Sequence, residues 1–292
     1  MNVENKSNIN WFPGHMTKAR RKIEASLKLV DAVCEIVDAR VPQSSRNPEL
    51  DKIIQRKPRI IVLNKCDMAD PKKTEQWIKY YKAQGITAMA ADCKSGKGVN
   101  AFSGVVKGVF EDKIKQWAEK GMIGRTIRVM VVGIPNVGKS SFINKLTKRT
   151  AAKAEDRPGV TRGNQWFTVD KTLDILDTPG VLWPKFEDPE VGEKLAFTGA
   201  VKDEVVDTEE LASNLLYYLR DNYPQSIIGR YKIDTDISDL KGYEILELVG
   251  KKRGMLIRGG ETDTLRASAT VLDEFRAAKL GRITLEGAPF NG

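Results

Sequence analysis

The stretch GIPNVGKSS, residues 133–141, follows the apolar run TIRVMVV and precedes the amphipathic run FINKL. Its spacing is G-x-x-x-x-G-K-S between a predicted strand and a predicted helix, the context in which this pattern forms a phosphate-binding loop. Its glycines let backbone N–H groups close around phosphates, and the helix N-terminus adds a favourable dipole. The stretch therefore predicts a nucleotide site. We expect Lys139 to reach the β- and γ-phosphates and the Ser140 hydroxyl to ligate magnesium. The predicted contacts are Asn136, Val137, Gly138, Lys139, Ser140 and Ser141.

A second phosphate-sensing segment is LDILDTPG, residues 173–180. Asp177 ends a predicted strand, where its carboxylate is expected to hold the magnesium, usually through water. Gly180 is expected to offer its N–H to the γ-phosphate, and a glycine there lets the loop move when that phosphate leaves. Between the two segments, Thr161 in RPGVTRG is expected to complete the magnesium shell.

The base is read by earlier residues. The run IIVLNKCD ends in Asn64, Lys65, Cys66 and Asp67. A carboxylate at Asp67 accepts hydrogen bonds from the ring N–H and exocyclic amine of guanine, which adenine does not present. Asn64 is expected to reach the opposite ring edge and Lys65 to pack over the base. The next predicted strand ends in ADCKSGKG, where Asp92 and Cys93 are further candidate base contacts.

The pattern of elements indicates an α/β domain followed by a helical one. Short β-branched runs alternate with helical patterns up to about residue 184, which predicts a mostly parallel sheet flanked by helices. A long amphipathic segment is predicted from Val99 to about Lys120. From about Val191 only helix-like periodicity remains. We expect domains at 1–184 and 185–292.

The motifs occur in an unusual order. Ordinary GTPases place the phosphate loop first, whereas this chain has NKCD (64–67) and DCK (92–94) before GIPNVGKS (133–140) and DTPG (177–180). Together with WFPGHM, DARVPQSSRNPEL, PGVTRG and DTPGVLWPKFED, this order resembles the circularly permuted GTPases of ribosome assembly. The resemblance spans nearly the whole chain. It implies a P-loop GTPase domain with permuted motifs and a cytoplasmic enzyme that binds GTP and GDP and acts late in large-subunit assembly.

Hydrolysis needs a positioned water and charge stabilisation. Val181 stands where many small GTPases carry a glutamine after the switch glycine, so another group must act. Asn136 resembles the asparagine that ligates potassium in related GTPases. In the resembling family, the histidine of WFPGHM, here His15, is proposed to act on the attacking water. The alternative is that WFPGH only anchors two aromatics and turns into the first helix.

Charge separates the halves of the chain. Residues 1–184 carry 33 Lys and Arg against 19 Asp and Glu, whereas residues 185–292 carry 15 against 20. The first half is the predicted site of ribosomal RNA contact, because basic surfaces attract phosphates. A second cluster of basic residues, at 251–253 in the helical domain, predicts RNA or ribosome binding there. For both clusters the alternative is that the basic residues only form solvated surface. The candidates are Lys18, Arg20, Arg21, Lys22, Lys251, Lys252 and Arg253.

The remaining composition excludes several classes. No run of about 18 apolar residues exists to span a membrane. Cys34, Cys66 and Cys93 lack zinc-site spacing and fit a reducing cytosol, with Cys66 and Cys93 filling space in the guanine loops. We expect a cytoplasmic monomer whose partners are GTP and immature large subunits, with Mg²⁺ and K⁺ as cofactors. The alternative function is a GTP-gated RNA-binding assembly factor in which hydrolysis is incidental.

Overall fold

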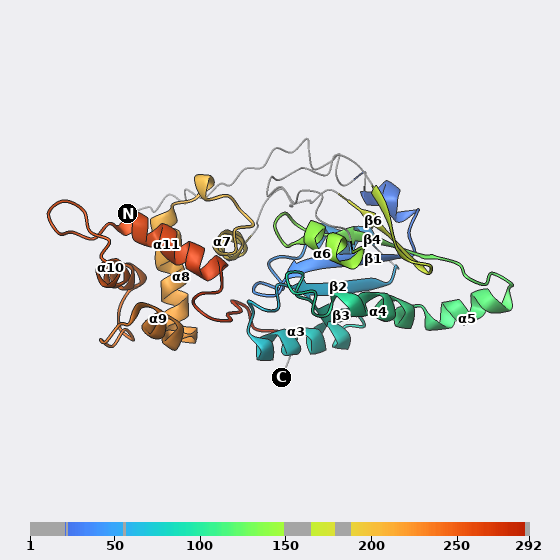
Figure 1. Cartoon of the computed structure of the whole chain (residues 1–292), viewed down its shortest axis with the longest axis horizontal. Coiled ribbons are helices and arrows are strands. Elements are labelled where there is room, and N and C mark those ends of the chain that lie inside the picture. Colours follow the sequence, from blue (N-terminus) through green and yellow to red (C-terminus); the bar gives the residue numbers. More distant parts are fainter. Residues whose placement is uncertain (1–20, 22, 55–56, 149–164, 179–187, 290–292) are drawn as a thin grey trace. The chain divides into compact units, whose positions relative to one another are not determined.

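A computed structural model describes residue 21 and residues 23–54, 57–148, 165–178 and 188–289. Two compact units divide the chain (Figure 1). One comprises Met1–Glu187 with Glu286–Gly292, and the other comprises Asp188–Leu285. This division differs from the expected end of the second domain at residue 292, because the chain returns to the first unit at Glu286.

The first unit is built on a six-stranded sheet with the order β3-β2-β1-β4-β6-β5. All neighbouring strands are parallel except β5, which pairs antiparallel with β6 at one edge. The sheet is therefore mostly parallel, as the β-branched runs predicted. The strands are β1 (Ala32–Asp38), β2 (Arg59–Asn64), β3 (Thr87–Ala90), β4 (Ile127–Val132), β5 (Gln165–Asp170) and β6 (Leu173–Asp177).

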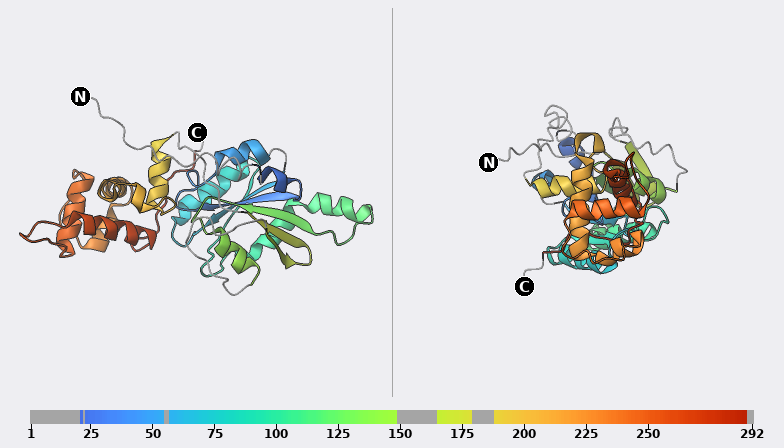
Figure 2. Two further views of the ribbon diagram at one scale, coloured as in Figure 1. Left: turned by 90° about the horizontal axis from the view of Figure 1, so that it is seen from above. Right: turned by 90° about the vertical axis from the view of Figure 1, so that its left-hand side faces the viewer.

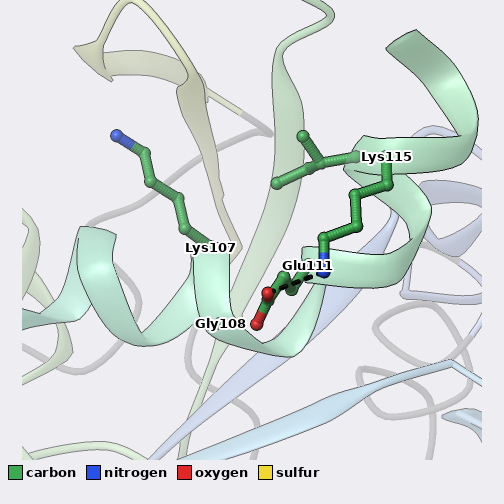
Figure 3. Close-up of a pocket in the computed structure, with 5 residues that line it drawn as sticks. Lys107, Gly108, Glu111 and Lys115 are labelled. Atoms are coloured by element: carbon green, nitrogen blue, oxygen red, sulfur yellow. Dashed lines mark hydrogen bonds and ion pairs between the residues drawn. The ribbon is translucent and has the colours of Figure 1, made fainter. Parts of the chain in front are cut away.

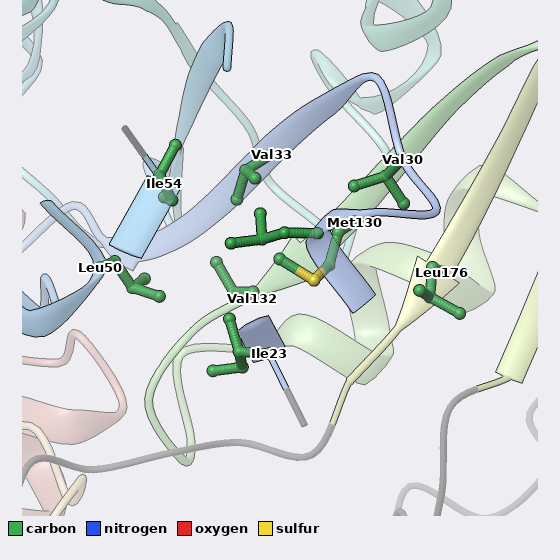
Figure 4. Close-up of a cluster of buried hydrophobic side chains, with 9 residues drawn as sticks. Ile23, Val30, Val33, Leu50, Ile54, Met130, Val132 and Leu176 are labelled. Carbon is green, nitrogen blue, oxygen red and sulfur yellow. The ribbon is translucent and has the colours of Figure 1, made fainter. Parts of the chain in front are cut away.

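Helices cover both faces of this sheet (Figure 2, left). On one face, residues 23–27, which are helical, and α2 pack with β1, β4 and β6 around Val33 and Met130 (Figure 4). On the other face, Phe102 and Phe142 join α4 to α6 by an edge-on ring contact with centroids 5.1 Å apart. The helices are α2 (Pro48–Ile54), α3 (Pro71–Ala83), α4 (Phe102–Val109), α5 (Glu111–Glu119) and α6 (Lys139–Leu146), with a short 3₁₀ turn η1 (Val99–Ala101).

Local sequence explains where these elements begin and end. Asp70 caps α3 by accepting from the backbone N–H groups of Lys72 and Lys73, and Pro71 occupies the first turn, where no N–H is needed. The amphipathic segment predicted from Val99 onward is interrupted at Phe110, whose φ of −107° and ψ of 11° are not helical. The segment therefore forms two helices, α4 and α5.

A shallow pocket lies at the junction of α4 and α5 (Figure 3). Its wall includes Lys107 and Ile114, and an ion pair between Lys115 and Glu111 one turn apart borders it. None of the nine residues of α5, all of them described, is buried. The residues that line this pocket include none from the predicted nucleotide loops.

The second unit is helical, as its periodicity predicted. Its central helix α8 contacts the other four and carries a buried stripe of Leu211, Leu215 and Leu219 at four-residue spacing. Gly242 lets α10 approach α8 closely, because a Cβ there would lie 1.9 Å from the carbonyl oxygen of Ser213. The helices are α7 (Pro189–Phe197), α8 (Thr208–Asn222), α9 (Pro224–Tyr231), α10 (Gly242–Lys252) and α11 (Thr264–Arg276), with a 3₁₀ turn η2 (Asp203–Val205). Among the described residues, no helix combines the length and apolar character that a membrane span requires.

Candidate functional site

The predicted nucleotide loops lie at the carboxyl ends of strands in the central part of the sheet. In parallel sheets, ligands bind outside the carboxyl ends of the strands. The predicted base contacts begin at Asn64, the last residue of β2, the predicted phosphate loop follows β4, and Asp177 ends β6. Because β1 lies between β2 and β4, segments about 70 residues apart in the chain meet at one edge. Although the motifs occur in permuted order along the chain, the fold brings their loops together at one edge of the sheet.

The phosphate loop, residues 133–138, has the backbone that a phosphate cradle requires. Gly138 adopts φ of 92° and begins α6, whose first residue is Lys139. Asn136 also lies in the left-handed region, with φ of 64°, which asparagine tolerates better than most residues. Side chains would crowd this turn, because a Cβ on Gly138 would lie 2.2 Å from Nδ2 of Asn64. The loop therefore presents backbone at the N-terminus of a helix, where anions bind favourably.

Asn64 and Lys65 tie the guanine loop to the phosphate loop. Nδ2 of Asn64 donates to the carbonyl oxygen of Val137 at 2.8 Å, and Asn64 is only 2% exposed. Nζ of Lys65 donates to the carbonyl oxygen of Asn136 at 2.7 Å. The Asn64 amide oxygen accepts from the backbone N–H of Cys93 at 3.3 Å, which adds the loop after β3. Three loops are thus joined at one point.

The other guanine-loop residues divide into an exposed acid and supporting groups. Asp67 is exposed beside this junction, as a base-reading carboxylate requires. Asp92 instead closes its own turn by accepting from the N–H groups of Lys94 and Ser95 and from the Ser95 hydroxyl. Burial opposes ionisation of Asp92, but these hydrogen bonds outweigh it and lower its pKa. Burial, with the nearby charge of Asp92, raises the pKa of Cys93 to about 12, so its thiol stays neutral.

Lys139 and Asp177 form a buried ion pair between the phosphate loop and the end of β6. Their side chains are 7% and 9% exposed. The Thr178 hydroxyl fixes the end of β6 by donating to the carbonyl oxygen of Val131 at 2.8 Å. Magnesium prefers oxygen ligands and is held in nucleotide sites by one or two protein groups plus phosphates. The Asp177 carboxylate pairs with Lys139, and Ser140 is the next residue after Lys139. The Asp177 carboxylate and the Ser140 hydroxyl are oxygen donors of the kind that magnesium prefers.

Asp38 is a site residue to which sequence reasoning assigned no role. It ends β1 and accepts two hydrogen bonds from the Arg40 guanidinium, at 3.0 and 2.8 Å. It also accepts from the backbone N–H of Arg40 at 3.0 Å and pairs with Nζ of Lys65 at 3.0 Å, so it orients the lysine that also holds the phosphate loop. Burial raises the pKa of Asp38, but the charges of Arg40 and Lys65 outweigh it and hold the pKa well below its usual range. The only signal in the sequence was the quoted DARVP.

Only some of the remaining predicted site residues fall within the described part of the chain. His15, Thr161 and Gly180, and the basic residues Lys18, Arg20 and Lys22, lie outside the described residues. Arg21 is described and exposed.

The basic residues of the second unit each have an acidic neighbour. Nζ of Lys252 lies 2.7 Å from Asp234 and Nζ of Lys251 lies 3.7 Å from Glu247. Arg253 lies 2.9 Å from Glu274. An RNA phosphate at this spot competes with carboxylates already in place.

Comparison with known proteins agrees with this geometry. A family model described as "50S ribosome-binding GTPase" matches residues 128–253. The chain is 48% identical over 279 residues to the "Ribosome biogenesis GTPase A" of Priestia megaterium, covering 95% of this chain and 96% of that protein. It is 47% identical to the protein of the same name from Bacillus cereus, covering 95% and 93%.

The chain belongs to the ribosome biogenesis GTPase A family. Its fold agrees with that assignment, because the crystal structure of GNP-bound YlqF from Thermotoga maritima matches with a TM-score of 0.62 and 30% identity. That match covers 93% of this chain and 99% of the other. The sequence-based assignment of a permuted GTPase is thereby confirmed.

Proposed function

We propose that this chain binds GTP across the joined loops, hydrolyses it to GDP and phosphate, and is stimulated by the immature large ribosomal subunit. One observation carries the proposal: Asn64 and Lys65 of the guanine loop donate to carbonyls of the phosphate loop. The two loops therefore form one surface, with the exposed Asp67 at the base end and Lys139 at the phosphate end.

Each end of this surface has a chemical task. Asp67 accepts from the two guanine donors, while Cys66, Asp92 and Cys93 shape the base pocket. At the other end, Lys139 and the backbone of Val137, Gly138 and Ser141 bind phosphate oxygens, and Gly180 contacts the γ-phosphate. Ser140, Thr161 and Asp177 are the proposed holders of Mg²⁺, which neutralises charge on the β- and γ-phosphates. A Mg²⁺-bound triphosphate supplies a counter-charge to both members of the Lys139–Asp177 pair.

The remaining need is a group that orients water and one that offsets transition-state charge. We assign the first task to His15, because histidine is the side chain most often used to accept or donate a proton in catalysis. The second falls to a potassium ion held by the Asn136 side chain. The Asn136 backbone is already fixed by the hydrogen bond from Lys65, which supports a defined position for that side chain.

The proposed partner is the ribosomal RNA of an immature large subunit in the cytoplasm, bound by a monomer. The net positive charge of residues 1–184 supports this, with Lys18, Arg20, Arg21 and Lys22 as phosphate contacts. In the second unit, Lys251, Lys252 and Arg253 are exposed and remain candidates, although RNA must displace their carboxylate partners.

The substitution Asp67→Asn tests the base assignment. An amide in place of the carboxylate presents an N–H donor to the guanine amine, whereas the 2-oxo group of xanthine accepts from it. We expect the affinity for GDP to fall at least about tenfold, since an unmatched polar contact in a specific site is costly. Affinity for XDP should rise. Asp112→Asn, the same change at an exposed position in α5, is the control and should leave the GDP preference intact. Retained GDP preference in Asp67→Asn would contradict the assignment.

Stimulated turnover is tested by measuring phosphate release with and without immature large-subunit particles, in potassium and in sodium. We expect a large rise with particles and a higher rate in potassium. Turnover that particles leave unchanged would remove the proposed stimulation and favour a factor whose bound state alone is active.

A further inference from the structure

The loop that follows β1, residues 39–47, is buried apart from Gln43. Ser44 and Asn47 are 3% and 5% exposed. Buried backbone N–H groups need partners, because leaving one unpaired is costly. Carboxylates supply several of them. Asp38 accepts from the N–H of Arg40 at 3.0 Å, Glu35 accepts from the N–H of Asn47 at 2.9 Å, and Glu286 accepts from the middle of the loop.

Glu286 is held against this loop by both its side chain and its main chain. Its carboxylate accepts from the backbone N–H of Gln43 at 2.6 Å, from the N–H of Ser44 at 3.1 and 3.2 Å, and from the Ser44 hydroxyl. Its carbonyl oxygen accepts from Nε1 of Trp77 at 3.2 Å. The residue is 8% exposed. Glu286 is therefore packed into the first unit, to which it belongs.

The same loop leads to the nucleotide site through a short series of contacts. The Ser45 hydroxyl accepts from the backbone N–H of Asp38 at 2.9 Å and donates to the carbonyl oxygen of Val41 at 2.7 Å. Asp38 lies 3.0 Å from Nζ of Lys65, and Lys65 donates to the carbonyl oxygen of Asn136. From Glu286 to the phosphate loop, each link is a hydrogen bond, an ion pair or one or two steps along the chain.

We infer that Glu286 is a positioning residue for the nucleotide site, acting through residues 39–47, Asp38 and Lys65. Its carboxylate fixes Gln43 and Ser44, which keeps Ser45 and Asp38 in register and holds Lys65 against the phosphate loop. The inference rests on the proposed nucleotide site at Lys65 and the phosphate loop. It assigns a role in nucleotide affinity to a residue that lies 242 positions after Ser44, the residue it holds.

The test is GDP affinity of the full chain carrying Glu286→Gln. This change keeps the shape but turns one acceptor into an N–H donor facing the N–H of Gln43 or Ser44. We expect the Kd for GDP to rise about three- to tenfold, the range typical of residues that act on a site through others. Glu204→Gln, the same change at an exposed position in the second unit, is the matched control and should leave the Kd unchanged.

A double-mutant cycle separates positioning from general destabilisation. If Glu286 acts through Asp38, the combined variant Glu286→Gln with Asp38→Asn loses less affinity than the product of the two single losses. A combined loss equal to that product, or an unchanged Kd in Glu286→Gln, overturns the inference.

Trp77→Phe provides an independent variant if Glu286→Gln does not fold. It removes the donor to the Glu286 carbonyl together with part of the apolar packing of this buried ring. A smaller rise in Kd is expected, and an unchanged Kd overturns the inference. The unaltered protein and Asp67→Asn are measured beside these variants. Failure of the unaltered protein to bind GDP, or of Asp67→Asn to lose it, rejects the proposed function instead.

Discussion

The close approach of Gly138 to Asn64 makes one substitution especially informative. Gly138→Ala introduces a Cβ 2.2 Å from Nδ2 of Asn64, at a backbone φ of 92°. Left-handed backbone costs a non-glycine residue about 1–2 kcal/mol. Displacing Asn64 also breaks its bond to Val137, worth about 0.5–1.5 kcal/mol. Together the two effects predict a loss of about 1.5–3.5 kcal/mol in the free energy of unfolding.

Thermal unfolding and GDP titration measure both consequences. For domains of 150–250 residues, 1 kcal/mol shifts Tm by about 2–4 °C, so a loss of 2 kcal/mol lowers Tm by about 4–8 °C. The Kd for GDP should rise at least about tenfold, equivalent to 1.4 kcal/mol, because the displaced amide separates the two loops.

The control is Gly108→Ala in α4, an exposed helical glycine whose added Cβ meets nothing within 4 Å. It should stabilise the protein by about 0.5–1 kcal/mol and leave GDP binding unchanged. If Gly138→Ala melts and binds GDP as the unaltered protein does, the described contact between Gly138 and Asn64 is wrong.

Three further predictions concern Asp38, Asn136 and His15. Because the folded-state pKa of Asp38 is depressed, its stabilisation is present above the ordinary aspartate pKa of about 3.9 and is lost as pH falls below it; Asp38→Asn should therefore flatten the acid-side decline in Tm. An equally steep decline in the variant would refute this. Asn136→Gly removes the amide while keeping the left-handed backbone, so the potassium-over-sodium ratio of turnover should fall to one, with GDP affinity as the control. His15→Ala should lower particle-stimulated turnover by at least about tenfold and leave GDP affinity unchanged; unaltered stimulation would remove His15 from catalysis.

Much of the fold was predictable because its signals are local. The apolar run before Gly133 and the G-x-x-x-x-G-K-S spacing indicate a strand, loop and helix without knowledge of any distant residue. The β-branched runs likewise predict a mostly parallel sheet, and the protein has one. The break at Phe110 was missed because amphipathic periodicity continues on both sides of it, and Gly108, the nearest glycine, lies inside α4 rather than at the break.

The contacts that complete the site were not predictable from spacing. Asp38 meets Lys65 only because β1 and β2 are paired in register, with Asp38 opposite Asn64. Lys252 pairs with Asp234, which lies 18 residues away, and Arg253 pairs with Glu274, which lies 21 residues away. Both separations are far larger than the three- or four-residue spacing of neighbours on one helix. Glu286 is separated from Ser44 by 242 residues. Such pairings depend on tertiary packing, which no short pattern encodes.

The separation between Trp77 and Glu286 along the chain, 209 residues, has a consequence for synthesis. Domains generally fold as they emerge during translation, at about 5–20 residues per second. The indole N–H of Trp77 waits for a carbonyl 209 residues later, which corresponds to about 10–40 s of elongation. During that interval the Ser44 N–H and hydroxyl also lack this acceptor. The first unit is therefore expected to reach its final stability only after Glu286 has left the ribosome that makes it.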